Sequence, residues 1–184
     1  MKREFEESVQ NLYEKITKNL IRTGRSITAM ESCTGGFLAS LLTDTEGASA
    51  VFHGAFVTYS NEAKVMAGVP RDVIDTYSVY SMETAAAMAK AARQHFGTDI
   101  SVGITGSFGN TDPANPESSV PGEIFFAIET KDGVQRYRAE LPLNECRHES
   151  KLRAALLVGE RLFSYVEETV QGEEKQPERG GEDV

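Results

Sequence analysis

The sequence predicts an α/β protein, a three-layer α/β/α sandwich built around a mixed sheet. Two observations predict this fold class. Short apolar runs alternate with helical patterns along the first two thirds of the chain, which favours parallel strands joined by helices. These runs cover residues 25–30, 53–59 and 99–105. A further run at 123–129 is followed by Lys131-Asp132-Gly133 and a second run at 134–141, which predicts an antiparallel hairpin.

Helical spacing and capping residues predict the helices. Apolar residues recur at intervals of three and four from Phe5 to Leu20, and Gly24 ends that pattern. Ser81 is a favourable N-cap for a long Ala-rich helix, and Gly97 ends it. The predicted helices span residues 4–23, 35–43, 60–66, 72–77, 82–96 and 146–170, with one helical turn at 48–52.

The composition predicts one globular domain followed by an acidic tail. The chain has 184 residues and 40% apolar residues, enough for a sizeable core, so residues 1–170 are expected to form a single domain. Residues 171–184 have no periodicity and many acidic groups, and we expect them to be disordered. The net charge of −9 argues against a nucleic-acid surface but permits a small anionic ligand at a local site.

The two cysteines and three histidines do not form a metal-binding pattern. Cys33 and Cys146 are far apart, and neither belongs to a C-x-x-C pair, so neither a metal site nor a redox role for Cys33 is expected. The N-terminus is too charged for a signal peptide, and no apolar run is long enough to span a membrane. We therefore expect a cytoplasmic protein without membrane partners.

The segment from Glu31 to Gly36 is a predicted turn between a strand and a helix. Its two glycines permit a tight backbone, and the N-terminus of the following helix favours anions. The plainer interpretation is that Ser32 or Thr34 caps the helix. The chemical interpretation is that Ser32 is a nucleophile, which requires a nearby base.

Three segments follow predicted strands and should meet at one edge of the sheet: Glu31–Gly36, Thr58–Lys64 and Thr105–Gly122. Alone, Lys64 is typical of an exposed helical lysine, and Tyr59 is typical of a packed strand aromatic. Together with Ser32 they suggest a serine activated by a lysine whose pKa is lowered.

Two blocks closely resemble the nicotinamide-nucleotide amidohydrolase family, which is the C-terminal domain of the competence- and damage-inducible CinA proteins. They are Glu31-Ser-Cys-Thr-Gly-Gly36 and Gly54-x-x-Val-Thr-Tyr-Ser-Asn-Glu-Ala-Lys64, and Gly68-Val69 adds to them. Weaker similarity covers about residues 8–168. Because the larger N-terminal domain of full CinA proteins is not seen in this sequence, we expect the stand-alone form of the domain. The resemblance implies hydrolysis of the carboxamide of nicotinamide mononucleotide, which gives nicotinate mononucleotide and ammonia without a cofactor.

The resemblance also implies roles for particular residues. It places the nucleophile on Ser32, the base on Lys64 and an assisting hydroxyl on Tyr59. Backbone N–H groups from Cys33 to Gly36 would stabilise the oxyanion. The residues expected to contact substrate are Glu31, Cys33, Thr34, Gly35, Gly36, Ser49, Asn61, Thr105, Gly106 and Arg147, with Lys151 one helical turn further on.

The third family block departs from the usual pattern. Thr105, Gly106, Gly109 and Gly122 hold their places, but the family's proline and lysine are missing and Glu123 replaces a threonine. A carboxylate near the phosphate would weaken binding by like-charge repulsion. Two alternatives therefore stay open: a nucleotide- or partner-binding module without turnover, and an amidohydrolase for another amide. The resemblance also implies a homodimer or a higher homo-oligomer.

Overall fold

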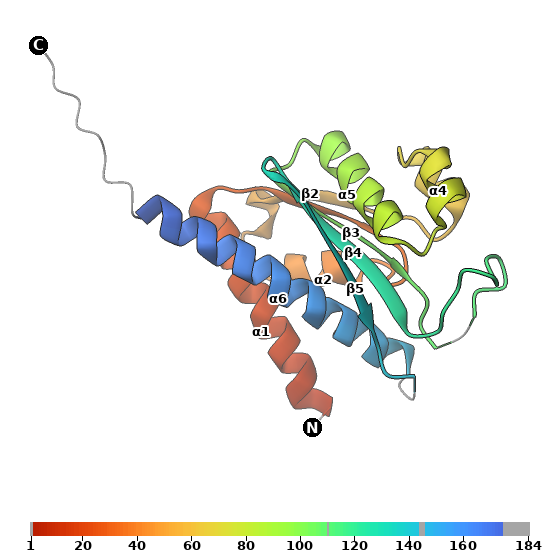
Figure 1. Ribbon diagram of the computed structural model, residues 1–184. Coiled ribbons are helices and arrows are strands. Elements are labelled where there is room, and N and C mark those ends of the chain that lie inside the picture. The colour runs from red at the N-terminus through yellow and green to blue at the C-terminus, as the bar shows by residue number, and fades with distance from the viewer. Residues whose placement is uncertain (1, 110, 144–145, 175–184) are drawn as a thin grey trace, which may run out of the picture.

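A five-stranded mixed sheet forms the centre of the protein, as predicted (Figure 1). The computed structural model describes residues 2–109, 111–143 and 146–174. The strand order is β2-β1-β3-β4-β5; β1 pairs in parallel with β2 and β3, and the pairs β3–β4 and β4–β5 are antiparallel. The strands are β1 (Ile27–Glu31), β2 (Phe52–Val57), β3 (Ile100–Gly106), β4 (Glu123–Thr130) and β5 (Gly133–Glu140).

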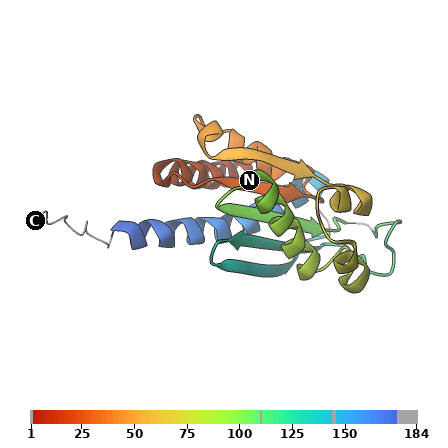
Figure 2. The same cartoon turned by 90° about the horizontal axis from the view of Figure 1, so that it is seen from above.

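Helices cover both faces of the sheet. The long helices α1 and α6 lie side by side with α2 on one face, and α5 lies on the other face next to α4 (Figure 1). Figure 2 shows that α6 continues past the edge of the sheet. The helices are α1 (Lys2–Thr23), α2 (Phe37–Thr43), α3 (Asn61–Met66), α4 (Arg71–Tyr77), α5 (Met82–Phe96) and α6 (Arg147–Glu174), with a short 3-10 turn at Ala48–Ala50.

Each face of the sheet has its own apolar core. Aliphatic side chains of α1, α2 and α6 pack on the first face with residues such as Ile27 and Ile104. On the second face, Met30 and Ala127 pack against the alanines of α5. The backbone of α5 approaches β3 at Gly103, where an added Cβ would lie 2.1 Å from a backbone oxygen of the helix. The small residues on α5 thus permit a close helix–sheet contact.

The sheet brings the ends of three strands to one edge. In the parallel register, Glu31 pairs with both Val57 and Ile104, so β1, β2 and β3 end together. The chain leaves β1 toward β2 on one side and returns through α3, α4 and α5 to β3 on the other side. Such a change of direction is where open α/β sheets bind ligands.

The main correction concerns the C-terminus. Helix α6 continues to Glu174, so residues 171–174 are helical and do not belong to an unstructured tail. The rest of the predicted tail, residues 175–184, lies outside the described residues. None of the helices in the described part of the chain is long and apolar enough to cross a membrane.

Candidate active site

Ser32 and Lys64 meet at the edge where the parallel strands end. The Nζ atom of Lys64 donates a hydrogen bond to Ser32 Oγ at 3.0 Å and another to the carbonyl oxygen of Thr58 at 2.9 Å. Ser32 directly follows β1, and its N–H donates to the carbonyl of Ile104, which extends the sheet by one step. Lys64 lies on α3, which packs next to this strand end. The structure thus joins two groups separated by 32 positions.

Lys64 is buried, and its charge is therefore costly. Its residue is only 2% exposed, and burial lowers the pKa of its amine from 10.5 to about 8. The carboxylate of Asp112 acts in the opposite direction, since its negative charge favours the ammonium form. A pKa near 8 leaves about one tenth of the amine neutral at pH 7, which is enough to supply a general base.

Cys33, next to the serine, does not compete as a nucleophile. Burial, followed by the charge of Glu31, raises the pKa of the Cys33 thiol to about 12. The thiol therefore stays protonated, and only thiolates are strong nucleophiles.

Glu31 holds the turn together from inside the protein. Its carboxylate accepts hydrogen bonds from the N–H groups of Gly36, Leu38 and Ala39 at 3.0, 3.1 and 2.8 Å. The residue is fully buried and serves the turn, so the structure gives it a structural role, and its expected contact with substrate stays a prediction. The expected capping by Ser32 or Thr34 is wrong, because Glu31 binds the first N–H groups of α2 in their place.

The glycines of the turn shape it but offer few donors. Gly35 and Gly36 both have positive φ, 63° and 91°. The N–H of Gly35 donates to the carbonyl of Ser32, and that of Gly36 donates to Glu31. The N–H groups of Gly35 and Gly36 are therefore used within the turn, and those of Cys33 and Thr34 donate toward the Cys33 sulfur.

A cavity of about 250 Å³ opens beside Ser32. Serine and cysteine come from the turn, aromatic residues from three separate segments, and a cation from the start of α6. The lining residues are Ser32, Cys33, Tyr59, Tyr80, Gly106, Ser107, Phe108, Thr111, Asp112, Pro113 and Arg147.

Arg147 and Tyr59 form the outer wall of this cavity. Arg147 donates a hydrogen bond from its guanidinium to Tyr59 Oη at 2.8 Å, and its Cζ lies 5.7 Å from the ring centroid of Phe108. Tyr59 is 65% exposed, so it is not the packed core aromatic that its strand position suggested. Its hydroxyl is held by Arg147.

Two residues expected at the site lie elsewhere or face away. Ser49 precedes β2, so it lies at the opposite edge of the sheet from Ser32. The buried hydroxyl of Thr105 donates to the carbonyl of Val79 at 3.0 Å. This hydrogen bond within the protein uses the hydroxyl proton. Strand register is the reason in both cases, since it fixes which end and which face each residue occupies.

Thr34 is part of the turn, and Lys151 contacts the turn from α6. Thr34 is fully buried, and among the described side chains its hydroxyl is buried without a hydrogen-bond partner. A Cβ built on Gly35 would lie 3.3 Å from Nζ of Lys151, so this ammonium covers the turn from the side of α6. Neither residue lines the cavity.

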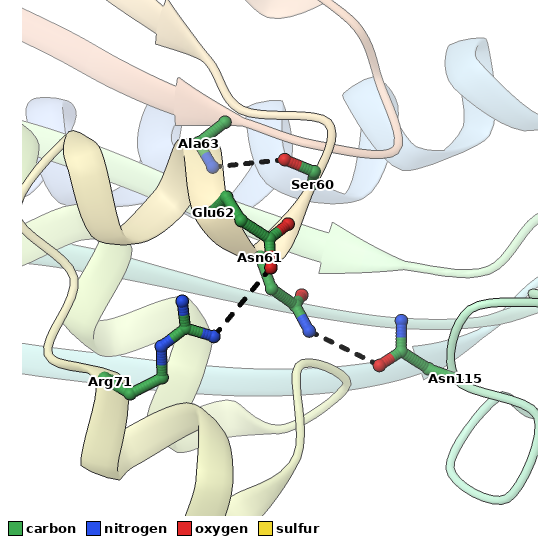
Figure 3. Close-up of polar contacts among 6 residues, drawn as sticks. All are labelled: Ser60, Asn61, Glu62, Ala63, Arg71 and Asn115. Atoms are coloured by element: carbon green, nitrogen blue, oxygen red, sulfur yellow. Dashed lines mark hydrogen bonds and ion pairs between the residues drawn. The ribbon is translucent and has the colours of Figure 1, made fainter.

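Asn61 connects α3 to the long loop after β3 (Figure 3). Its side-chain amide donates to Asn115 Oδ1 at 3.4 Å, while Ser60 caps the helix by accepting from the N–H of Ala63 at 3.1 Å. Figure 3 also shows Arg71 beside Glu62 on this side of α3. In this arrangement Asn61 positions the loop and does not line the cavity.

The expected repulsion by Glu123 is wrong, because that carboxylate is paired. Glu123 begins β4 and is buried, and it forms an ion pair with Arg138 on β5. It is also absent from the cavity lining.

Sequence reasoning missed Tyr80 and Asp112. The hydroxyl of Tyr80 donates to Asp112 Oδ2 at 2.6 Å, and both residues line the cavity. Asp112 also accepts from the N–H of Ala114 at 3.0 Å, an Asx turn that the Asp-Pro-Ala sequence favours. The sequence could have predicted this turn, but it could not have predicted the contact between Asp112 and Tyr80.

The described residues contain no cluster of three or more His, Cys, Asp or Glu side chains that could hold a metal ion. The chemistry that this site can offer from its own groups is nucleophilic attack by Ser32, with Lys64 as proton acceptor.

Comparison with known proteins identifies a family that matches most of this chain. The family described as CinA C-terminal domain matches residues 9–162. A CinA-like protein of Gemmatimonas aurantiaca is 41% identical over 138 residues, which are 74% of this chain and 31% of that protein. A putative competence-damage inducible protein of Streptococcus agalactiae is 39% identical over 143 residues, 76% of this chain and 33% of that protein.

Solved structures show the same fold. A CinA superfamily protein of Klebsiella pneumoniae has a TM-score of 0.79 at 22% identity and covers 87% of this chain and 98% of its own. The competence/damage inducible protein CihA of Agrobacterium tumefaciens has a TM-score of 0.76 at 29% identity, with 85% and 94% covered. This chain spans about a third of the length of the curated relatives it matches. It belongs to the CinA C-terminal domain family.

Proposed function

We propose that this protein hydrolyses the carboxamide of nicotinamide mononucleotide and releases nicotinate mononucleotide and ammonia. One observation carries the proposal: a buried amine with a pKa of about 8 lies 3.0 Å from a serine hydroxyl at the side of a cavity. A serine needs such a base, because its hydroxyl is a weak nucleophile at neutral pH. The identity of the substrate is inferred from the resemblance of the two sequence blocks to the nicotinamide-nucleotide amidohydrolase family.

The first half of the reaction forms an acyl-enzyme. In the ammonium form Lys64 donates to Ser32, and after loss of a proton the same contact reverses, so that the amine accepts the serine proton. Oγ then attacks the amide carbon, and the carbonyl oxygen becomes an oxyanion. As the family resemblance implies, backbone N–H groups of the turn after Ser32 would stabilise this oxyanion.

The second half regenerates the serine. Protonated Lys64 returns its proton to the amide nitrogen, the C–N bond breaks, and ammonia leaves. Water then attacks the ester carbon while Lys64 accepts its proton, and Ser32 Oγ is released as a hydroxyl after the proton returns. The carbonyl of Thr58 accepts an N–H of Lys64 throughout and so fixes the direction of the amine.

Tyr59 and Arg147 have supporting roles in this proposal. Because Tyr59 Oη accepts from Arg147, its own proton remains available to donate to the substrate. The Arg147 guanidinium supplies the cation for the phosphate, because its planar set of N–H donors can form two parallel hydrogen bonds with phosphate oxygens.

An ammonia-release assay with the mononucleotide tests the proposal. The intact protein should produce one ammonia for each nicotinate mononucleotide, and Ser32→Ala and Lys64→Ala should each lower kcat/KM at least about a thousandfold. Lys90→Ala is the matched control, because Lys90 is an exposed lysine on α5 away from the cavity. Its rate should equal that of the intact protein.

Two results would reject the proposal. Thermal stabilisation by the mononucleotide without product would indicate a binding module, since a ligand that binds only the folded state raises its stability. Ammonia release from another carboxamide in a parallel screen, with none from the mononucleotide, would retain the Ser–Lys chemistry and change the substrate.

A further inference from the structure

The cavity beside Ser32 contains two opposite charges that do not neutralise each other. Arg147 lies on one wall and Asp112 on another, and both line the cavity. Among the ion pairs of the described residues, none joins these two groups to each other; Asp112 also feels the Lys64 ammonium, but the two do not form a close ion pair. A binding site with separated, unpaired charges of both signs is complementary to a ligand that carries both signs.

Asp112 stays ionised in this environment. Hydrogen bonds from Asn115 at 2.7 Å and from Tyr80 at 2.6 Å hold the pKa of its carboxyl below the usual value. The backbone N–H of Ala114 donates to its other oxygen. Three of about four acceptor positions are therefore occupied. What this carboxylate offers a ligand is its negative charge, with little capacity left to accept from sugar hydroxyls.

The other wall residues fit a flat cationic ring. Tyr59, Tyr80 and Phe108 line the same cavity as Asp112. Aromatic faces attract cations, and a nearby carboxylate increases that attraction. An anionic group on the same ligand has Arg147 available at the outer wall.

We propose that Asp112 is a specificity-determining residue that selects carboxamides on a positively charged ring, with an anionic group of the same ligand directed to Arg147. This inference rests on the proposed function for the reaction, but its subject is the charge of the ring. It names a zwitterionic substrate class: N-alkylated pyridinium carboxamides with a phosphate are favoured, and the same molecules with a neutral ring are disfavoured.

Binding to a non-hydrolysing protein tests the selection separately from catalysis. In the Ser32→Ala background, calorimetry compares nicotinamide mononucleotide with its 1,4-dihydro form, which keeps the ribose, phosphate and carboxamide but has a neutral ring. The charged form should bind about tenfold more tightly. Adding Asp112→Asn should remove most of this preference, whereas the binding of the dihydro form should change little.

The matched control is Glu117→Gln in the same background. Glu117 is an exposed carboxylate on the same loop and does not line the cavity, so its removal should leave the preference unchanged. If Asp112→Asn fails to fold by circular dichroism, Asp112→Ser replaces it, because a hydroxyl also accepts from the Ala114 N–H without charge.

The outcomes separate the two proposals. Equal affinity for both forms, no binding of either, or a preference that persists without the Asp112 charge would each overturn the selection. Charge-selective binding that depends on Asp112, together with no ammonia from the intact protein, would retain the selection and reject the proposed hydrolysis.

Discussion

Replacing Lys64 with methionine should stabilise the folded protein at neutral pH while it removes the proposed base. The amine has a pKa of about 8 in the folded state and 10.5 as a free side chain. At 1.36 kcal/mol per pKa unit, burying the ammonium costs about 3 kcal/mol. Methionine has a similar length and no charge, so it avoids this cost.

The lost hydrogen bonds reduce the gain. Lys64 donates to Ser32 and to the carbonyl of Thr58, and leaving that carbonyl without its partner costs about 1 kcal/mol. The net gain for Lys64→Met at pH 7 is therefore about 2 kcal/mol. For a protein of this length, that corresponds to a Tm increase of about 4–8 °C.

The pH dependence of the folding stability shows whether the lowered pKa of Lys64 causes the gain. Because the folded pKa is the lower one, the unfolded chain binds more protons between pH 8 and pH 10.5, and stability rises with pH in that window. The penalty is fully present below pH 8 and is lost above about pH 10.5. The stability difference between the variant and the intact protein should therefore shrink as pH rises through this range.

Urea denaturation followed by circular dichroism, at several pH values from 6 to 10, measures this difference. Lys90→Met is the control, because that exposed lysine should show no such effect. A Lys64→Met variant that is less stable than the intact protein at pH 7, or a difference independent of pH, would show that burial does not lower the pKa of Lys64.

Four further predictions follow from the geometry. The value of kcat/KM should increase with pH up to about 8, as Lys64 loses its proton, and a flat profile from pH 6 to 9 would contradict its role as base. Arg147→Gln should raise KM for the mononucleotide at least about tenfold and affect the riboside, which lacks the phosphate, much less; equal effects in steady-state assays would exclude a phosphate contact. Glu31→Gln should lower the unfolding free energy by about 2–3 kcal/mol in urea titrations, because one neutral amide cannot replace a carboxylate bonded to three N–H groups; an unchanged midpoint would contradict this. Gly103→Ala should destabilise by at least about 3 kcal/mol, because its Cβ would lie 2.1 Å from the backbone of α5, whereas Gly24→Ala, with nothing within 4 Å, should cost about 1 kcal/mol; similar melting temperatures for the two would refute the close contact.

Local chemistry made most of the fold predictable from the sequence. The predicted helix 82–96 has the same bounds in the structure, because Ser81 Oγ accepts from the N–H of Thr84 and Gly97 adopts the left-handed conformation. The hairpin also followed from local signals, since Thr130 pairs with Gly133 across a two-residue turn. Alternation of strand and helix patterns then determined the mixed sheet.

Contacts between distant segments were less predictable. Sequence spacing alone does not show that Arg147 reaches Tyr59, which is 88 positions away, or that Tyr80 donates to Asp112. Ser49 was misplaced for the same reason, because only the strand register shows that it lies at the other edge. The Ser–Lys proximity was anticipated from the shared edge at which the predicted strands end, and the motif resemblance then assigned the roles of the two residues.

The position of Glu31 disfavours an anion at the start of the helix that follows the motif. A glycine-rich turn before a helix normally offers its first N–H groups and its positive dipole to a phosphate. Here a buried carboxylate from the preceding strand already accepts from three of those groups. A second anion at the same place would meet like charge and few free donors, so the proposed phosphate contact is left to Arg147, which lines the cavity beside Ser32. The internal cap thus keeps the phosphate of the proposed substrate away from the helix N-terminus, with the neutral carboxamide proposed at Ser32 and the phosphate at Arg147.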